Sequence, residues 1–182
     1  MKEFPEIKLN NIILRKLTLE DYDNYLDYVL DSDISKQFSF NYDNETAKKR
    51  LEEIVAKYES EKIPYIWAIA LIDTNELVGI ISLDSVSFRN KSFSMACGIR
   101  NKYRNNGYAY EAGNGLARFI FNNYDMNRLQ LSCLEENQGS IKMFEKAGLV
   151  FEGVAREAKY YDGKFKNKRI YSILKSEIKN LE

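Results

Sequence analysis

The sequence predicts a mixed α/β fold, in which helices flank a largely antiparallel sheet, as a single domain over residues 1–182. The first observation is periodicity, because apolar runs typical of strands are interspersed with runs of helical spacing. The second is size, since 182 residues suffice for one domain with a sizeable core but not comfortably for two. The third is continuity: the chain has only two prolines and no low-complexity linker or repeat.

The first third of the chain predicts one strand followed by two helices. The strand lies over residues 12–17, and Thr18 followed by Asp21 resembles a capping box that opens a helix running to about Leu30. The second helix begins at Asp43 or Asn44 and carries apolar residues at helical spacing, namely Ala47, Leu51, Ile54, Val55 and Tyr58.

The middle of the chain predicts three strands, over residues 65–72, 77–83 and 92–99. Polar turns at residues 73–76 and 89–91 separate them. Because both connections are short, we expect an antiparallel meander.

The period changes to that of a helix after Gly107, with apolar residues at 109, 112, 116, 119 and 120 on one face. Alternation over residues 129–133 predicts a strand, and residues 140–147 predict a short helix ended by Gly148. Asp162-Gly163 is a strong hairpin signal. The expected order is therefore βαα, three strands, αβα and a closing hairpin.

The composition excludes several classes of function. Lys plus Arg equals Asp plus Glu at 27 each, so we expect no nucleic-acid partner and no anionic membrane surface. The chain has no histidine and only two cysteines, which argues against His-based triads and metal sites, and we expect no metal. The longest apolar run is far shorter than a membrane span, and the first residues lack the apolar region of a signal peptide. We expect a cytoplasmic protein.

The segment over residues 99–109 joins a predicted strand to a predicted helix. Such a junction presents unpaired N–H groups and the positive end of the helix dipole, which together suit a phosphate group. Gly107 lets the backbone turn and approach a ligand, and Arg104 can add a charge-assisted contact. By itself this pattern also fits ordinary turn chemistry.

Several motifs carry a resemblance to a known family. Arg104-x-x-Gly107-x-Ala109 resembles the Arg/Gln-x-x-Gly-x-Gly/Ala motif of the GCN5-related N-acetyltransferase (GNAT) superfamily. Asn137-x-x-Ser140 and residues 143–158 resemble its ribosomal-protein N-terminal (serine/alanine) acetyltransferase branch, as do Asp162-Gly163 and residues 170–174. The resemblance covers nearly the whole chain from Ile12 onward.

The resemblance implies that an amine attacks the thioester of acetyl-CoA directly, without an acyl-enzyme. Backbone groups of the strand end would orient the pantetheine arm, the loop would hold the pyrophosphate, Asn137 would bond the arm, and Ser140 would lie near the sulfur. The implied coenzyme-binding residues are Gly98, Ile99, Arg100, Arg104, Asn105, Asn106, Gly107, Tyr108, Ala109, Asn137 and Ser140. Asn137 is equally suited to capping the helix that contains Ser140.

Two departures from the family pattern concern catalysis. Phe144 stands where many members carry a tyrosine that protonates the leaving thiolate, so the acid is Ser140, a water or no protein group. Ser94 stands where relatives of this branch often carry a glutamate base. Asp84 and Glu111 are substitute base candidates, although each also fits an ordinary surface or capping role.

The leading hypothesis is an acetyl-CoA-dependent N-acetyltransferase acting on a primary amine: a protein N-terminus, a polyamine, an amino sugar or an aminoglycoside. The rival is a catalytically weak acetyl-CoA-binding module. The acceptor groove of the family is built from the first helices and the last hairpin, which here supply aromatic residues with two acids nearby: Phe38, Phe40, Tyr42, Tyr160 and Tyr161, with Asp31 and Asp33. The sequence leaves the acceptor open, and also whether the protein is a homodimer.

Overall fold

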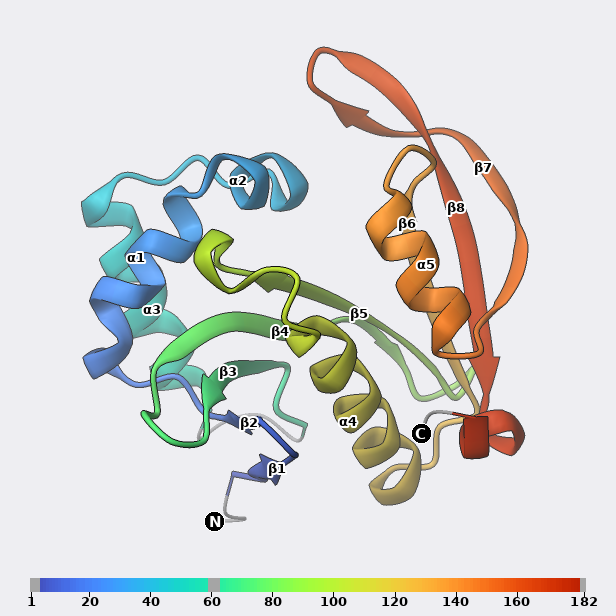
Figure 1. The fold of residues 1–182 in the computed structure, drawn as a ribbon, viewed down its shortest axis with the longest axis horizontal. Helices are drawn as coiled ribbons and strands as arrows, with labels where there is room; N and C mark the ends of the chain where they lie inside the picture. The colour runs from blue at the N-terminus through green and yellow to red at the C-terminus, as the bar shows by residue number, and fades with distance from the viewer. Residues whose placement is uncertain (1–3, 59–62, 181–182) are drawn as a thin grey trace. The chain divides into compact units, whose positions relative to one another are not determined.

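The computed structural model describes residues 4–58 and 63–180. Within them lie eight strands (Figure 1): β1 Ile7–Lys8, β2 Ile12–Arg15, β3 Ile66–Leu71, β4 Leu77–Ser87, β5 Ser92–Ile99, β6 Arg128–Leu134, β7 Val150–Tyr161 and β8 Lys164–Leu174. The α-helices there are α1 Tyr22–Leu30, α2 Ser32–Phe38, α3 Asn44–Lys57, α4 Tyr108–Asn123 and α5 Gln138–Lys146. Short 3-10 helices are η1 Leu19–Asp21, η2 Asn101–Tyr103 and η3 Lys175–Asn180.

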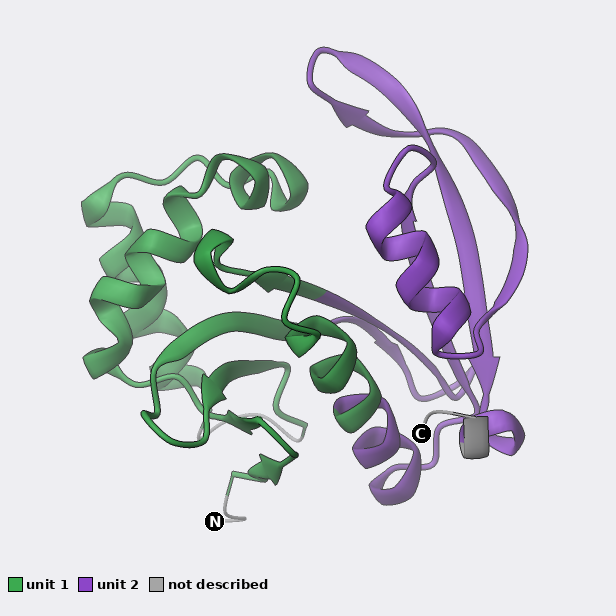
Figure 2. Cartoon of the chain, viewed as in Figure 1, with its two compact units in different colours: residues 1–82, 97–115 green, residues 83–96, 116–182 purple. Residues whose placement is uncertain are grey.

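The sheet has the strand order β1-β2-β3-β4-β5-β6-β8-β7. The pairs β1–β2, β2–β3, β3–β4, β6–β8 and β7–β8 are antiparallel, whereas β5 and β6 are parallel. This confirms the expected mixed α/β fold with a largely antiparallel sheet. The chain forms two compact units, Met1–Ser82 with Cys97–Gly115 and Leu83–Ala96 with Leu116–Glu182 (Figure 2). Strands β4 and β5 and helix α4 each contribute residues to both units.

The first unit is built around one apolar cluster. Helices α1, α2 and α3 pack against β3 and β4 through buried side chains, among them Tyr28, Ile34 and Leu51. The N-cap residues Asp31 of α2 and Asp43 of α3 accept backbone N–H groups of the first helical turn, and Asp21 closes the capping box before α1. Asp21 accepts from the Thr18 N–H at 2.9 Å, and Asp43 accepts from the Thr46 N–H at 2.8 Å. The predicted starts of both helices are thereby confirmed, although the first opens as η1.

Helix α2 was not predicted from the sequence. It is only seven residues long, so it is too short for apolar periodicity to show. Its start is set by Asp31, whose Oδ1 accepts from the N–H groups of Asp33 and Ile34, both at 3.0 Å. It ends at Ser39, which adopts a left-handed conformation with φ of 57°. An acid-rich stretch that resembles a loop is therefore a capped helix.

The second unit is built around β6, β8 and β7. Strand β6 pairs with β5 in parallel through Phe93 and Leu129, and the Phe93 ring lies 5.1 Å from that of Phe121 on α4. Strands β7 and β8 form a long antiparallel hairpin (Figure 1), whose turn contains Asp162 and Gly163 with φ of 51° and 77°. Two positive φ values in a two-residue loop are typical of a type I′ turn, which the Asp-Gly pair predicts.

Candidate functional site

The predicted coenzyme loop joins β5 to α4, as the sequence indicated, and it contains the short helix η2, which the sequence did not indicate. Asn105 and Gly107 both adopt left-handed conformations, with φ of 66° and 81°. The first bond of the helix runs from the Glu111 N–H to the Gly107 carbonyl at 3.0 Å. The N–H groups of Tyr108 and Ala109 therefore lie in the first turn of a 16-residue helix, where backbone N–H groups have no partner within the helix. This turn carries the positive end of the helix dipole.

The space in front of Gly107 is open. A Cβ placed on this residue would find no described heavy atom within 4 Å, so its backbone is accessible to a ligand. The turn itself is held by Asn106, whose side-chain amide donates to the carbonyls of Tyr103 and Arg104 at 3.1 and 3.2 Å. The loop thus uses the Asn106 side chain to keep its shape, while the space at Gly107 stays open.

Arg104 is engaged in internal contacts. Its guanidinium donates to Asp31 at 2.8 Å and to Asp33 at 2.6 Å, both in or next to α2, and to the Ile99 carbonyl at 3.1 Å. A charge-assisted contact to phosphate, which the sequence suggested, would have to share this guanidinium with two carboxylates.

The end of β5 is packed closely. A Cβ on Gly98 would lie 2.6 Å from the Tyr28 hydroxyl and 2.8 Å from the Ile34 side chain, so only glycine fits there without displacement. Ile99 is buried. Gly98 is therefore required by packing, independently of any contact with the pantetheine arm.

Arg100 is a buried structural residue. Its guanidinium donates to Asp27 at 2.7 Å, to Glu76 at 3.2 Å and to the Leu77 carbonyl at 2.6 Å. Its backbone N–H donates to the Val78 carbonyl at 2.9 Å. These contacts use the Arg100 side chain within the fold, and its role toward the arm stays a prediction that concerns the backbone alone.

In the second unit, Asn137 caps α5. Its Oδ1 accepts from the Ser140 N–H at 3.0 Å, which is the capping role that the sequence left open. The Ser140 side chain is half-buried in the first turn. Phe144, one turn further, is buried and packs edge-on against Tyr171 with ring centroids 5.5 Å apart. The position where relatives carry a tyrosine acid is therefore part of the apolar core here.

The two base candidates have different surroundings. Both oxygens of Glu111 are bound by Asn11, whose backbone N–H and side-chain amide donate at 2.8 and 3.0 Å. Asp84 is exposed at the outer part of β4 and lies 3.5 Å from the Ser94 hydroxyl, which is itself 2.8 Å from that of Ser85. The structure thus brings Asp84 beside Ser94, the residue that stands in place of the family's glutamate.

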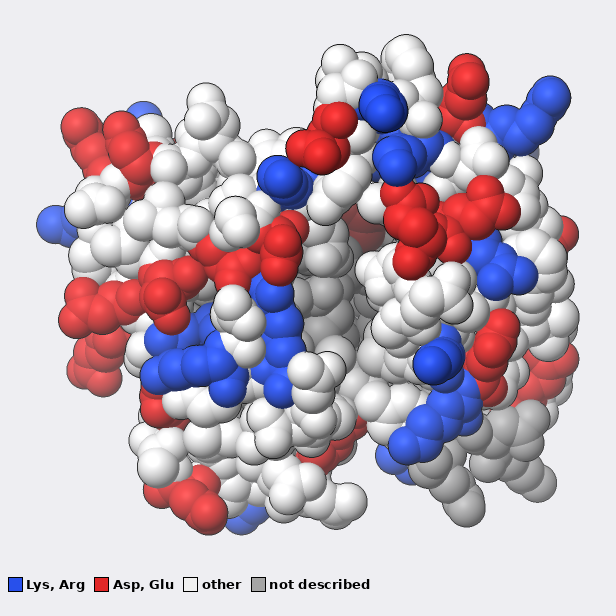
Figure 3. All heavy atoms as spheres, turned by 45° about the horizontal axis from the view of Figure 1, so that its top comes forward, with Lys and Arg blue, Asp and Glu red and all other residues white. Residues whose placement is uncertain are grey.

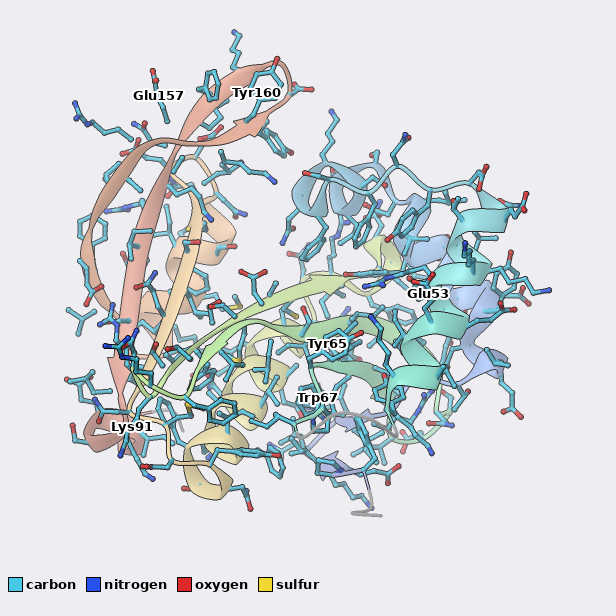
Figure 4. The ribbon with its side chains drawn as sticks, turned by 180° about the vertical axis from the view of Figure 1, so that it is seen from behind. Glu53, Tyr65, Trp67, Lys91, Glu157 and Tyr160 are labelled. Carbon is cyan, nitrogen blue, oxygen red and sulfur yellow. The ribbon has the colours of Figure 1, made fainter. Side chains whose placement is uncertain are left out.

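Each compact unit also carries a group of aromatic side chains in contact with one another. Phe38, Phe40 and Tyr42 form a continuous stack with centroids 5.5 and 5.0 Å apart. On the β7–β8 hairpin, Tyr160 lies toward the turn, near Glu157 (Figure 4), with its ring 5.2 Å from that of Phe165. The family resemblance assigns aromatic residues in both places to the acceptor groove, which stays a prediction, and the sequence did not indicate the stacking.

Other chemistries find little support in the described residues. Burial raises the pKa of the Cys97 thiol to about 12, which disfavours a thiolate nucleophile. No cluster of three or more Cys, Asp or Glu side chains is placed there to hold a metal ion, and none of the helices is long and apolar enough to cross a membrane. On the face drawn in Figure 3, basic and acidic groups are interspersed.

The chain belongs to the GNAT acetyltransferase family, because residues 11–150 match the model of the acetyltransferase (GNAT) domain. The N-acetyltransferase YoaA of Bacillus subtilis (strain 168) is 25% identical over 174 residues, covering 94% of this chain and 98% of YoaA. A GNAT-family acetyltransferase structure from Bacillus anthracis has a TM-score of 0.82 at 24% identity, over 95% of this chain and 100% of that chain. The ribosomal-protein α-N acetyltransferase RimL in complex with coenzyme A has a TM-score of 0.77 at 16% identity, over 93% and 98%.

These similarities define the protein as an acetyltransferase whose cosubstrate is acetyl-CoA. The resemblance that the loop and C-terminal motifs indicated is confirmed at the level of the family and the fold. The positions of the individual site residues relative to the coenzyme stay predictions.

Proposed function

We propose that the protein transfers the acetyl group of acetyl-CoA to a primary amine by direct attack, and that α-amines are its better acceptors. The observation that carries the proposal is the start of α4, where unpaired N–H groups follow two left-handed residues and the space before Gly107 is open. Such an arrangement binds a pyrophosphate through backbone groups and the helix dipole. In this proposal Gly107, Tyr108 and Ala109 supply the N–H groups.

The chemistry of the step calls for a neutral amine, stabilisation of the carbonyl oxygen and a proton for the thiolate. In this proposal the backbone at Gly98 and Ile99 orients the arm, and Asn137 contributes its amide NH₂ group because its Oδ1 caps α5. Ser140 is the candidate acid. Since a thiol has a pKa near 8.5, the thiolate is a tolerable leaving group even without a strong acid.

The partners of the acidic side chains support the choice of an α-amine as acceptor. Asp31 and Asp33, which the sequence suggested for a cationic acceptor, are paired with Arg104, and Glu111 is held by Asn11. Asp84 is left as an exposed carboxylate beside two hydroxyls, a site suited to receiving a proton through water. A site without a dedicated base favours α-amines, whose pKa is about 7.7–8.0, over alkylamines near 10.4. RimL, a protein of the same fold, is named as an α-N acetyltransferase.

The test is release of coenzyme A thiol with a panel of amines at matched concentration. Peptides beginning with Ser or Ala, the same peptides with a blocked N-terminus and one internal Lys, spermidine and an aminoglycoside cover the classes. We expect the free α-amine peptides to give the highest kcat/KM. Tight binding of acetyl-CoA without thiol release for any amine would favour the rival, a coenzyme-binding module without turnover.

The remaining predictions from the sequence belong to the same proposal. The family match over residues 11–150 includes parts of both compact units, which supports one functional domain over residues 1–182. A cytoplasmic location would place the enzyme with the acetyl-CoA it uses. Gel filtration of the purified chain tests whether the domain acts as a monomer or a homodimer.

A further inference from the structure

Arg104 lies in the predicted coenzyme loop, but its guanidinium group is occupied by contacts with protein oxygens. Three of its guanidinium nitrogens donate to protein oxygens: Nη1 to Asp33 at 2.6 Å, Nη2 to Asp31 at 2.8 Å and Nε to the Ile99 carbonyl at 3.1 Å. Its side chain is 28% exposed, and that of Asp31 only 12%. One cation beside two carboxylates leaves a net negative charge, which by itself repels a pyrophosphate.

The same part of the chain rests on α1 and α2 at further points. The Tyr28 hydroxyl and the Ile34 side chain occupy the space that a Cβ on Gly98 would need. The side-chain amide of Gln37 donates to the Cys97 carbonyl at 3.4 Å. With the Arg104 contacts, residues 97–104 are held along the surface of α1 and α2, all within the first compact unit.

We propose that Arg104 is a positioning residue and not a phosphate ligand. Its ion pairs with Asp31 and Asp33 hold its guanidinium group against α2, and they thereby fix the conformation of the loop that receives the pyrophosphate. Arg104 directly precedes Asn105, the first left-handed residue of the turn. Holding the Arg104 side chain therefore sets the direction in which the chain enters the turn, and with it the orientation of the N–H groups at the start of α4. The inference rests on the proposed function only in taking acetyl-CoA as the ligand.

The two roles of Arg104 predict opposite effects for Asp33→Asn. If Arg104 binds phosphate directly, removing a competing negative charge strengthens acetyl-CoA binding. If Arg104 positions the loop, loosening it weakens binding, and we expect the Kd to rise about threefold. Asp33 is the better target because Asp31 also caps α2. The matched control is Asp23→Asn, the same charge change on an exposed residue of α1, which should leave the Kd unchanged.

Calorimetric titration with acetyl-CoA, together with a thermal melt, measures these effects. We expect Asp33→Glu to restore part of the affinity and Arg104→Gln to raise the Kd about tenfold. Adding Asp33→Asn to Arg104→Gln should change the Kd no further, because both substitutions remove the same ion pair between Arg104 and Asp33. In steady-state kinetics the single variants should raise KM for acetyl-CoA and leave kcat nearly unchanged.

The outcomes distinguish a failure of the positioning role of Arg104 from a failure of the proposed function. An Asp33→Asn variant that folds and binds acetyl-CoA as tightly as the wild type, or more tightly, overturns the positioning role while the proposed function stands. Additive effects of Arg104→Gln and Asp33→Asn also overturn it. A wild-type protein that fails to bind acetyl-CoA removes the proposed function, and the inference with it.

Discussion

The proposed coenzyme segment, over residues 97–111, and the hydroxyl–carboxylate group of Asp84, Ser85 and Ser94 use their side chains in opposite ways. In the coenzyme segment, charged side chains such as Arg100 and Glu111 are bound by other parts of the protein. The backbone at Gly107 remains accessible. In the second group the side chains are exposed or half-buried, and Asp84 meets Ser94 only at 3.5 Å.

This difference suggests that the first group of side chains has a structural role and that the second acts in the chemical step. Substitutions in the coenzyme segment should change folding or coenzyme affinity, because its side chains maintain a backbone shape. Substitutions at Asp84 should change the rate of the chemical step and leave stability alone, because little structure depends on this carboxylate.

The largest effect is expected for Gly98→Ala. The added Cβ would lie 2.6 Å from the Tyr28 hydroxyl and 2.8 Å from Ile34, and overpacking of this kind lowers the free energy of unfolding by about 1–3 kcal/mol. Urea denaturation measures the loss. Gly113→Ala is the control, since its Cβ meets no described atom within 4 Å and alanine favours a helix, so stability should stay equal or rise. Equal stability of both variants would show that β5 is not closely packed here.

The second prediction is that Gly107→Val weakens acetyl-CoA binding at least tenfold, or about 1.4 kcal/mol, because the side chain would occupy the space open to the pyrophosphate. Valine is also strained at a φ of 81°. Gly163→Val controls for that strain, because Gly163 has a φ of 77° and equally open surroundings in the β7–β8 turn. Calorimetry on both variants is the measurement. Equal coenzyme affinity in the two variants would remove the pyrophosphate assignment.

The third prediction concerns Asp84→Asn, which should lower kcat/KM by less than tenfold with an unchanged melting temperature. A positioned general base usually contributes about 10²–10⁴. We also expect kcat/KM to rise with pH along the titration of the acceptor amine and to level off above its pKa. Wild-type and variant pH–rate profiles test this. A thousandfold loss with coenzyme binding intact would instead identify Asp84 as a dedicated base.

The fourth prediction concerns Glu76, which bonds the buried Arg100 of the coenzyme segment. Hydrogen bonds from Tyr103 and Lys102, with a further one from Arg100, lower the pKa of Glu76 from 4.5 to about 2. The folded pKa lies below the unfolded one, so this stabilisation is present above pH 4.5 and is lost as the pH falls toward 2. Glu76→Gln should cost about 1 kcal/mol at pH 7 after allowance for solvent screening. Its difference from wild type should disappear at low pH in urea titrations; a constant difference would contradict the assignment.

The smallest effect is expected for Glu111→Gln. The amide oxygen can still accept from the Asn11 N–H, so we expect a loss of a few tenths of a kcal/mol from an exposed contact and an unchanged kcat. A thermal melt and steady-state kinetics on one preparation measure both quantities. If kcat falls and the melting temperature does not, Glu111 takes part in acetyl transfer, and its role is not purely structural.

Local signals predicted the fold well where a few neighbouring residues carry the information. The caps at Thr18 and Asp43, the turn at Asp162-Gly163 and the change of period after Gly107 are confirmed. Boundaries shifted by a few residues, for example in β4, which continues to Ser87. Among the described strands and α-helices, β1, with two residues, and α2, with seven, escaped prediction, because neither is long enough to show a period.

The sequence by itself determined the family, the order of the main elements and the junction of strand and helix around Gly107, since these depend on residue types a few positions apart. Only the tertiary structure decided the partners of the charged residues. Arg104 meets Asp31 across 73 positions, and Glu111 meets Asn11 across 100. An ion pair or hydrogen bond depends on which distant segments the fold brings together, and a residue's type and neighbours do not contain that information. For this reason Asp84 and Glu111 were equal candidates in the sequence and differ in the structure.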